Sequence, residues 1–276
     1  MKIALLTHSV RPRGGVVHTL ELAEALVRRG HAVTVIASAE PGETLFRAVR
    51  FPVETIALPA LHGELVAQVA QRIDALVQTL PPLLGRGGFD LVHAQDSLSG
   101  NALALLREAG HVLPPWLRTV HHLDDFAQDV LNRWQERAWR AADGLACVSD
   151  GWCRHFHETL GQPAERMFNG VDLTRYRPAP EPGDAAAVSS LGLPAATGPV
   201  VLLVGGVEAR KNTVRLLQAF AQRRAEDPAW ADARLVVAGG ASMLDHGAAR
   251  RDWQATLAQT GLAEGPQQAV LRTGPL

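Results

Sequence analysis

The sequence predicts an α/β fold with two lobes, because a strand, a glycine pair and a helix follow one another at two places in the chain. The first copy is a strand over 2–7 with a loop that closes on Gly14-Gly15 at a helix start. The second is a strand over 200–205 that runs into Gly205-Gly206 and another helix. In α/β folds this order brings backbone N–H groups close to a phosphate.

Apolar runs and helical periods alternate along the chain, which predicts βαβ units and mostly parallel sheets. The expected strands of the first lobe are 2–7, 31–37, 53–57, 89–94, 117–121, 144–148 and 165–168. The expected helices of that lobe are 15–29, 64–80, 98–109, 126–142 and 150–160. The second lobe is expected to contain strands 200–205, 234–239 and 268–272 and helices 212–224 and 246–260.

Two elements illustrate how these ranges follow from residue type. The first helix places Val17, Leu20 and Val27 on one broad apolar face and ends before Gly30, a residue that commonly follows a helix. The next strand contains Val-Thr-Val-Ile over 33–36, the β-branched content of a buried parallel strand.

The clearest change in composition lies at 177–199, where proline, glycine and alanine dominate. We interpret it as a linker or surface hinge between an N-terminal lobe, 1–176, and a partial C-terminal lobe, 200–276. Three strands and two helices make only about half of a lobe of ~100–150 residues. Such a lobe would leave a sheet edge unpaired and an apolar face uncovered, which favours self-association.

Composition excludes several classes of protein. The 276 residues are 47% hydrophobic and 20% charged with a net charge of −1, so no global field attracts nucleic acid or anionic lipid. No apolar stretch reaches the ~18–20 residues of a membrane span. The chain opens on a strand and not on a charged and apolar leader, so we expect a cytoplasmic protein without a transmembrane segment.

The spacing of a cysteine and histidine cluster argues against a metal site. Cys147, Cys153, His155 and His157 lie close in sequence but fit no common metal template, and two cysteines are no disulfide framework. The simpler interpretation is a small core thiol beside a helix, and we expect no metal.

Ligands of parallel sheets bind outside the carboxyl ends of the strands, so each junction there is a candidate. The loop from Thr7 to Gly15 lacks Gly-x-Gly-x-x-Gly, and its basic residues suit a diphosphate or an incoming hydroxyl, with a plain turn as the alternative. Further junctions end at Asp96 and at Asp125, and the histidines there suit sugar hydroxyls or acid–base work. We expect one histidine to be functional.

For several polar residues a structural role competes with a functional one. Asp124 or Asp125 is placed to cap a helix that starts near Phe126, and Ser149 is placed to cap the next helix. The segment Asn169-Gly-Val-Asp172 fits an ordinary turn, but it follows the last strand of the first lobe.

The second glycine unit carries Glu208, Arg210 and Lys211 before a helix that begins near Asn212. Two cations beside helix N–H groups form a strong anion site, because charge and helix dipole act together. The alternative is a solvated helix start.

Taken in order, these motifs resemble the GT-B glycosyltransferases, in particular the retaining enzymes of family four (glycosyl transferases group 1). The resemblance covers nearly the whole chain. The resembling segments are the opening strand with Gly14-Gly15, Thr119-Val-His121, Cys147-Val-Ser149, Asn169-Gly-Val-Asp172 and the block from Val204-Gly-Gly through Arg210-Lys211 to Phe220. It implies two Rossmann-like lobes and the transfer of a sugar from a nucleotide-diphosphate donor, such as a UDP- or GDP-sugar, to an acceptor hydroxyl, with retention and without a metal or other cofactor.

The resemblance also implies roles for single residues. Gly14 and Gly15 match the loop near the donor diphosphate, and His121 matches a catalytic histidine at the donor sugar. Lys211 matches the lysine that neutralises the donor phosphates, and Gly205 and Arg210 beside it are expected to bind the diphosphate with it. The residues expected to line the cleft are Asp96, Ser149, Asn169, Gly170, Val171 and Asp172.

Two departures from the family pattern stand out. Gly206 occupies a position where the family usually has arginine, so Arg210 would have to supply that charge. The family's Glu-x7-Glu segment has no counterpart before Leu276, so the chain is either a fragment of a longer enzyme or a naturally shortened one. We expect it to be weakly active or inactive alone.

Two other classes of function stay open. A non-catalytic nucleotide- or sugar-binding fragment is favoured by the missing acidic segment. An NAD-dependent oxidoreductase or epimerase is disfavoured, because no Gly-x-Gly-x-x-Gly follows the first strand and Tyr176 is the single tyrosine.

Overall fold

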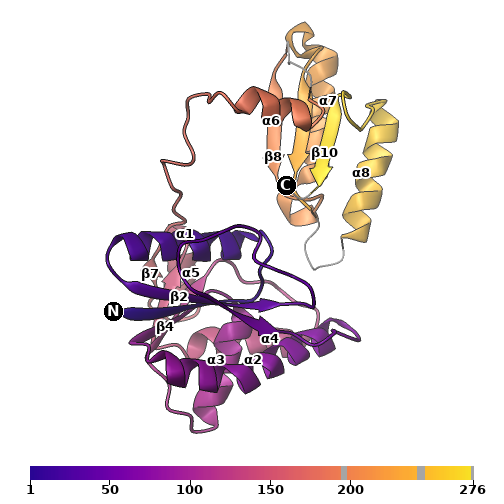
Figure 1. Ribbon diagram of the computed structural model, residues 1–276. Coiled ribbons are helices and arrows are strands. Elements are labelled where there is room, and N and C mark those ends of the chain that lie inside the picture. Colours follow the sequence, from indigo (N-terminus) through magenta and orange to yellow (C-terminus); the bar gives the residue numbers. More distant parts are fainter. Residues whose placement is uncertain (194–197, 241–245, 275–276) are drawn as a thin grey trace. The chain divides into compact units, whose positions relative to one another are not determined.

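The computed structural model describes residues 1–193, 198–240 and 246–274, and the chain divides into two compact units, Met1–Tyr176 and Arg177–Leu276 (Figure 1). Each unit contains a parallel sheet with helices packed on it, so the predicted α/β class is confirmed.

The first unit is built on a seven-stranded parallel sheet with the order β3-β2-β1-β4-β5-β6-β7. Its strands are β1 (Lys2–Thr7), β2 (Ala32–Ala39), β3 (Val53–Ala57), β4 (Leu91–Ala94), β5 (Trp116–Val120), β6 (Gly144–Cys147) and β7 (Glu165–Arg166). In register, Leu5 of β1 lies beside Val35 of β2 on one side and beside His93 of β4 on the other. The order reverses at β1, so the carboxyl ends of β1 and β4 form the switch point at which α/β sheets bind ligands.

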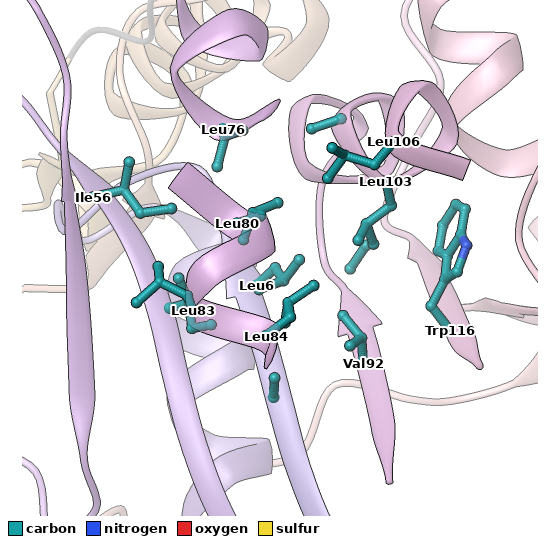
Figure 2. Packing of buried hydrophobic residues seen from close by; sticks show 14 residues of the cluster. Leu6, Ile56, Leu76, Leu80, Leu83, Leu84, Val92, Leu103, Leu106 and Trp116 are labelled. Carbon is teal, nitrogen blue, oxygen red and sulfur yellow. The ribbon is translucent and has the colours of Figure 1, made fainter. Parts of the chain in front are cut away.

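The helices of this unit cover both faces of the sheet. They are α1 (Gly14–Arg28), α2 (Leu65–Gly87), α3 (Ser97–Glu108), α4 (Asp129–Arg140) and α5 (Asp150–Glu158). On the α1 face, Leu5 and Val35 pack with Leu20. On the other face, α2 and α3 pack on β1 and β4 through a cluster that includes Leu80 and Leu103 (Figure 2).

Helix α2 corrects the expected end at residue 80. The helix runs on through Pro81 and Pro82 to Gly87, and Gly88 closes it with φ 57°. Leu80, Leu83 and Leu84 are all buried in the core shown in Figure 2. Burial of these three leucines outweighs the local cost of the prolines, because burying each leucine contributes about 1.5–3 kcal/mol.

The loop after β5 corrects a second expectation, since α4 begins at Asp129 and not near Phe126. Neither Asp124 nor Asp125 caps it, because Gln128 is the residue that precedes the helix. Side chains of α4 hold the loop instead. Asn132 Oδ1 accepts from Phe126 N at 3.0 Å, and Gln135 makes the same kind of contact with the backbone of Asp124.

The second unit contains a three-stranded parallel sheet with the order β10-β9-β8. Its elements are α6 (Asp184–Ser190), β8 (Val200–Val204), the short 3₁₀ turn η1 (Ala209–Lys211), α7 (Thr213–Glu226), η2 (Pro228–Trp230), β9 (Arg234–Ala238), α8 (Gly247–Thr260) and β10 (Val270–Gly274). Trp253 of α8 and Leu217 of α7 are fully buried against Leu235 of β9.

Strand β8 lies at an edge of this sheet, as the sequence predicts for one strand of the lobe. Val200, Leu202 and Val204 lie on one face of this strand, and their side chains are 52%, 61% and 78% exposed. Within the described residues this face of β8 is therefore apolar and uncovered, which confirms the expectation.

The proposed linker 177–199 contains a helix that the sequence analysis did not predict. Helix α6 has no buried residue, so its sequence and not its packing decides its formation. After it, Gly192 accepts a hydrogen bond from Gln267 N at 3.1 Å, which ties this part of the segment to the second unit. Residues 194–197 of the segment lie outside the described residues.

No helix in the described parts of the chain has both the length and the apolar composition that a bilayer crossing requires.

Candidate functional site

The carboxyl ends of β1, β4 and β5 bring polar side chains together beneath α1. In register, Leu5 of β1 pairs with His93 of β4, and His93 pairs with Leu117 of β5. Two residues further along each strand, the same register places Thr7, Gln95 and Thr119 side by side. Alternate residues of a strand share a face, so these side chains lie on the same face as the core residue Leu5. That face is the one covered by α1.

Three histidines form the centre of this region, and we call His18, His93 and His121 the histidine cluster. His18 lies in α1, His93 in β4, and His121 directly after β5. The rings of His18 and His121 meet edge to face with centroids 4.9 Å apart and planes at 78°. His93 Nε2 lies 2.7 Å from Thr119 Oγ1 in the interior.

All three rings are held neutral by their surroundings. Burial lowers the pKa of His93 to about 3, and the neighbouring His18 adds to the effect. Burial likewise lowers the pKa of His121 to about 3. The pKa of His18 is lowered by burial, while the polar side chain of Asn169 acts in the opposite sense. Neutral imidazoles can donate one hydrogen bond and accept another, so the cluster suits hydroxyl groups better than proton donation from an imidazolium.

Several atoms of this region lack a hydrogen-bond partner among the described residues. They are Thr7 Oγ1, both amide atoms of Gln95, both ring nitrogens of His18 and Nε2 of His121. Gln95 is only 2% exposed. Buried polar groups are nearly always satisfied, so such a group of orphaned atoms indicates that water or a ligand completes them.

The predicted glycine pair adjoins this cluster. Gly14 and Gly15 are the first two residues of α1, and Arg13 before them provides no side-chain cap within the described structure. A Cβ at Gly15 would lie 3.6 Å from His121 Cδ2, whereas a Cβ at Gly14 would meet nothing within 4 Å. The structure therefore brings together Gly15 and His121, two predicted site residues that are 106 positions apart in the chain.

Asp96, a predicted cleft residue, belongs to a second polar group beside this cluster. It caps α3 by accepting from Ser99 N at 2.8 Å, and its Oδ2 lies 3.9 Å from His8 Nδ1. Burial lowers the pKa of the His8 ring even though the charge of Asp96 opposes it. Arg118 is buried nearby, where its pKa falls to about 10 and it donates to Thr119 O.

The other predicted cleft residues are not all gathered at the histidine cluster. Ser149 caps α5 by accepting from Trp152 N at 3.2 Å, the alternative that the sequence left open. Asn169 is exposed, but its side chain lies close enough to His18 to act on that ring, and Gly170 and Val171 are exposed as well.

Asp172 lies farther from the cluster, since its Oδ2 is 3.3 Å from Nη1 of Arg28, the last residue of α1. Arg28 is ten residues after His18, or about 15 Å along the helix. Hydrogen bonds from the side chain and the backbone N–H of Thr174 lower the pKa of Asp172, so this carboxylate orders its own turn.

The second unit holds the predicted anion site at the carboxyl end of β8. Gly205 has φ 136°, and a Cβ there would collide with Lys211 Nζ. A Cβ at Gly239 would lie 2.9 Å from Gly205 Cα, so the backbones after β8 and β9 approach closely. Only glycine allows both the backbone angle and the lysine to occupy this place.

Lys211 is held in that position by a buried carboxylate. Glu208 is 3% exposed, and its oxygens lie 3.2 Å from Lys211 Nζ and 3.6 Å from Arg210 Nη2. The lysine side chain is 29% exposed and the arginine side chain 64% exposed, so both cations keep one side toward solvent. Helix α7 starts at Thr213 after Asn212 with φ 52°, one residue later than predicted.

Sequence reasoning missed His18. It placed His93 and Gln95 in the junction that ends at Asp96, and Glu208 in the second glycine unit, without choosing them as site residues. His18, His93, Gln95 and Glu208 carry no motif, and each is recognised by its burial in the fold. A usable signal existed for two of them, because His93 and Gln95 alternate with Val92 and Ala94 in a strand that should be apolar on both faces.

A hollow of about 450 Å³ lies along the outer side of α1 and is lined by charged residues of both signs, including Glu21, Arg47 and Arg175. The lining residues include none from the histidine cluster. In the parts of the chain that are described, no three histidine, cysteine or acidic side chains come close enough to hold a metal ion.

Comparison with known proteins identifies a family match over the first unit. The sequence pattern of Glycosyltransferase Family 4 matches residues 12–175, more than half of the chain. Among curated relatives, a D-inositol 3-phosphate glycosyltransferase of Kineococcus radiotolerans is 30% identical over 253 residues, which are 82% of this chain and 56% of the relative. The protein of that name from Xylanimonas cellulosilytica is 29% identical over 255 residues, which are 82% of this chain and 58% of the relative. The chain thus spans less than two thirds of the length of these relatives.

Solved structures show the same fold at low identity. Sucrose-phosphate synthase from Thermosynechococcus elongatus superposes with a TM-score of 0.77 at 20% identity, over 100% of this chain and 71% of that one. Anabaena HepE, in complex with UDP and glucose, superposes with a TM-score of 0.68 at 20% identity, over 100% of this chain and 70% of that one.

Proposed function

The chain belongs to Glycosyltransferase Family 4, and from this premise we propose that it transfers a sugar from a nucleotide-diphosphate donor to an acceptor hydroxyl. Two lines of comparison support the donor class. The curated relatives carry the name of a glycosyltransferase, and the HepE structure of similar fold contains UDP and glucose. The donor of this chain is accordingly a nucleotide sugar, with UDP as the first nucleotide to test.

One observation carries the proposal, namely that Lys211 Nζ lies over Gly205 at the carboxyl end of β8. Loss of a nucleotide diphosphate puts negative charge on the leaving group, and a fixed cation beside backbone N–H groups stabilises that charge. Lys211 also lies at the start of α7, where the helix dipole favours an anion. These features support a diphosphate site in this loop.

The histidine cluster of the first unit has a different part in the proposal. His121 is neutral and has an unpartnered Nε2, so it is suited to hydrogen-bond a sugar hydroxyl and not to protonate a leaving group. The N–H groups of Gly14 and Gly15 at the start of α1 lie beside it and suit a phosphate or hydroxyl oxygen.

Finer features of the proposal rest on the family resemblance. These are retention of anomeric configuration, independence of metal, and weak or absent turnover by these 276 residues alone. Proton NMR of a product's anomeric centre tests the first, and activity measured with a chelator tests the second.

Self-association and location also belong to the proposal. The exposed apolar face of β8 supports pairing with a second copy of the chain. The two cysteines are free thiols, which supports a reducing compartment such as the cytoplasm.

The test is calorimetric titration of the protein with UDP and with GDP, repeated on Lys211→Ala. Lys2 is the only other lysine of the chain and lies exposed in β1, so Lys2→Ala is the matched control. We expect one nucleotide to bind, Lys211→Ala to weaken it at least about tenfold, and Lys2→Ala to leave it unchanged.

Other outcomes separate the alternatives. Binding of a nucleotide without transfer or hydrolysis of the nucleotide sugar would favour a non-catalytic binding fragment. A folded protein that binds neither nucleotide would contradict the proposed donor site.

A further inference from the structure

The loop after β8 contains a charged residue that the donor-site proposal does not use. Glu208 lies three residues before Lys211 and is 3% exposed, the strongest burial among the three charged side chains of the loop. Acidic residues are almost never buried to this extent unless they are paired, so its burial needs a reason.

The contacts of Glu208 supply that reason. One carboxylate oxygen lies 3.2 Å from Lys211 Nζ and the other lies 3.6 Å from Arg210 Nη2. Its backbone is also anchored, since Glu208 N donates to Thr213 Oγ1 at 3.4 Å and this hydroxyl lies 3.3 Å from Gly206 O. The carboxylate is thus fixed to the start of α7, and the two cations are arranged around it.

The net charge of this loop favours the binding of an anion. Two cations and one carboxylate leave a net charge of +1 on the loop, and the carboxylate is on the buried side. Lysine has a flexible four-carbon stem, and an unfixed lysine loses its rotamer freedom when it binds a phosphate. A lysine already held by Glu208 loses less of it.

We infer that Glu208 is a positioning residue that holds Lys211 over Gly205 in readiness for the β-phosphate of the donor, an inference that rests on the proposed glycosyl transfer. A buried glutamate serves a phosphate-binding lysine in the same way in protein kinases, where the ion pair must be in place for activity. The chain has glycine at 206, so Glu208 also arranges the two cations that this loop supplies.

A buried carboxylate beside Lys211 can change nucleotide affinity in either of two directions, and a substitution of Glu208 distinguishes them. A carboxylate that merely competes with the phosphate for Lys211 would weaken nucleotide binding, and its removal would then strengthen it. Glu208→Gln keeps the shape of the side chain and removes its charge, so the direction of the change in affinity decides between the two effects.

The experiment is calorimetric titration with UDP and with UMP, which lacks the β-phosphate, on wild-type protein and Glu208→Gln. We expect UDP affinity to fall about tenfold while UMP affinity changes less. The matched control is Glu226→Gln, the same substitution at an exposed position of α7, which should leave both affinities unchanged. Equal or tighter UDP binding by Glu208→Gln would overturn the inference.

A double-mutant cycle tests whether Glu208 acts through the lysine. In the Lys211→Ala background, Glu208→Gln should cause no further loss of UDP affinity, since the residue to be positioned is gone. Additive losses would contradict the inference. Should Glu208→Gln reduce the yield of folded protein, Glu208→Asp keeps the charge and withdraws the carboxylate by one methylene. It should bind UDP more weakly at an unchanged melting temperature, and wild-type affinity in that variant would count against positioning.

Failure of the underlying function is distinguishable from failure of this inference. Wild-type protein that binds neither UDP nor GDP overturns the donor site itself and the role of Glu208 with it. Wild-type binding that Lys211→Ala weakens and Glu208→Gln does not weaken overturns only the positioning role.

Discussion

The rings of His18 and His121 pack edge to face with their centroids 4.9 Å apart, although 103 positions separate them in the chain. His18 reaches this place from α1 and His121 from the end of β5. The contact joins the glycine start of α1 to His121, the histidine for which the family resemblance predicts a role at the donor sugar. It fixes the orientation of the His121 ring, because the ring is held between α1 and the sheet while its Nε2 keeps no partner among the described residues.

The glycine beside that ring gives the first prediction. Gly15→Ala would place a methyl group 3.6 Å from His121 Cδ2, an ordinary contact that the fold tolerates. Alanine also favours a helix by up to about 1 kcal/mol over glycine, so we expect unchanged or higher stability. We expect the affinity for the nucleotide sugar to fall at least about tenfold, because the methyl group occupies the space beside the ring.

Gly14→Ala is the control, since a methyl group there meets nothing within 4 Å. Thermal unfolding and calorimetric titration with the nucleotide sugar on both variants make the comparison. Equal affinity of the two variants for the nucleotide sugar would show that the space beside His121 is not used.

The buried histidines predict a dependence of stability on pH. His93 has a folded-state pKa of about 3 against an ordinary value of 6.5, so the unfolded chain binds a proton that the folded chain rejects. The contribution of His93 to the free energy of unfolding is therefore complete above pH 6.5 and is lost as the pH falls from 6.5 toward 3. The loss has a limiting slope of about 1.4 kcal/mol per pH unit.

Urea unfolding at a series of pH values measures this slope, and His93→Gln should reduce it. Ring NMR signals of His93 and His121 should not titrate between about pH 8 and about pH 5. Titration of either ring in that range would contradict the burial that the structure shows.

The two thiols predict a difference in reactivity. Burial raises the pKa of the Cys147 thiol to about 12, whereas Cys153 is half-buried on α5. The thiolate is the reactive form, so iodoacetamide should label Cys153 first and Cys147 only when the protein unfolds. Mass spectrometry of the labelled peptides follows the two sites separately. Rapid labelling of Cys147 in folded protein would rule out a core position.

The edge strand β8 predicts association. Antiparallel pairing of two β8 edges centred on Leu202 would set Val200 of one copy against Val204 of the partner subunit on the same face, because side-chain direction repeats every two residues. We expect a concentration-dependent dimer in sedimentation velocity.

Leu202→Lys should remove that dimer, since a lysine on an edge strand opposes pairing. Val112 is fully exposed in the first unit, so Val112→Lys adds the same charge elsewhere and should not change the association. A wild-type monomer at high concentration would contradict the pairing.

Local chemistry was enough to predict a large part of this structure. The bounds of β1 and β3, the glycine pair at the start of α1 and the cap at Ser149 all follow from short stretches of sequence. The parallel α/β class is also predictable from local sequence. Short apolar strand segments alternate with segments of helical periodicity, and this pattern can be read without knowledge of any long-range contact.

Other features depend on what a segment packs against. Helix α2 continues through Pro81 and Pro82 because the leucines around them are buried, and the loop before α4 stays open because Asn132 and Gln135 hold its backbone. Neither effect is visible in the propensities of the residues concerned, because burial and long-range hydrogen bonds outweigh preferences of about 1–3 kcal/mol.

The residues of the candidate sites also fall into these two groups, those predictable from the sequence and those that depend on packing. The sequence by itself determined which residues are available at the strand ends, among them Gly15, His121 and Lys211. Only the tertiary structure decided that His18 packs on His121 and that Glu208 is the buried partner of Lys211. The physical reason is that a side chain's burial and partners depend on strand register and helix packing, which bring together positions that are remote or unremarkable in the chain.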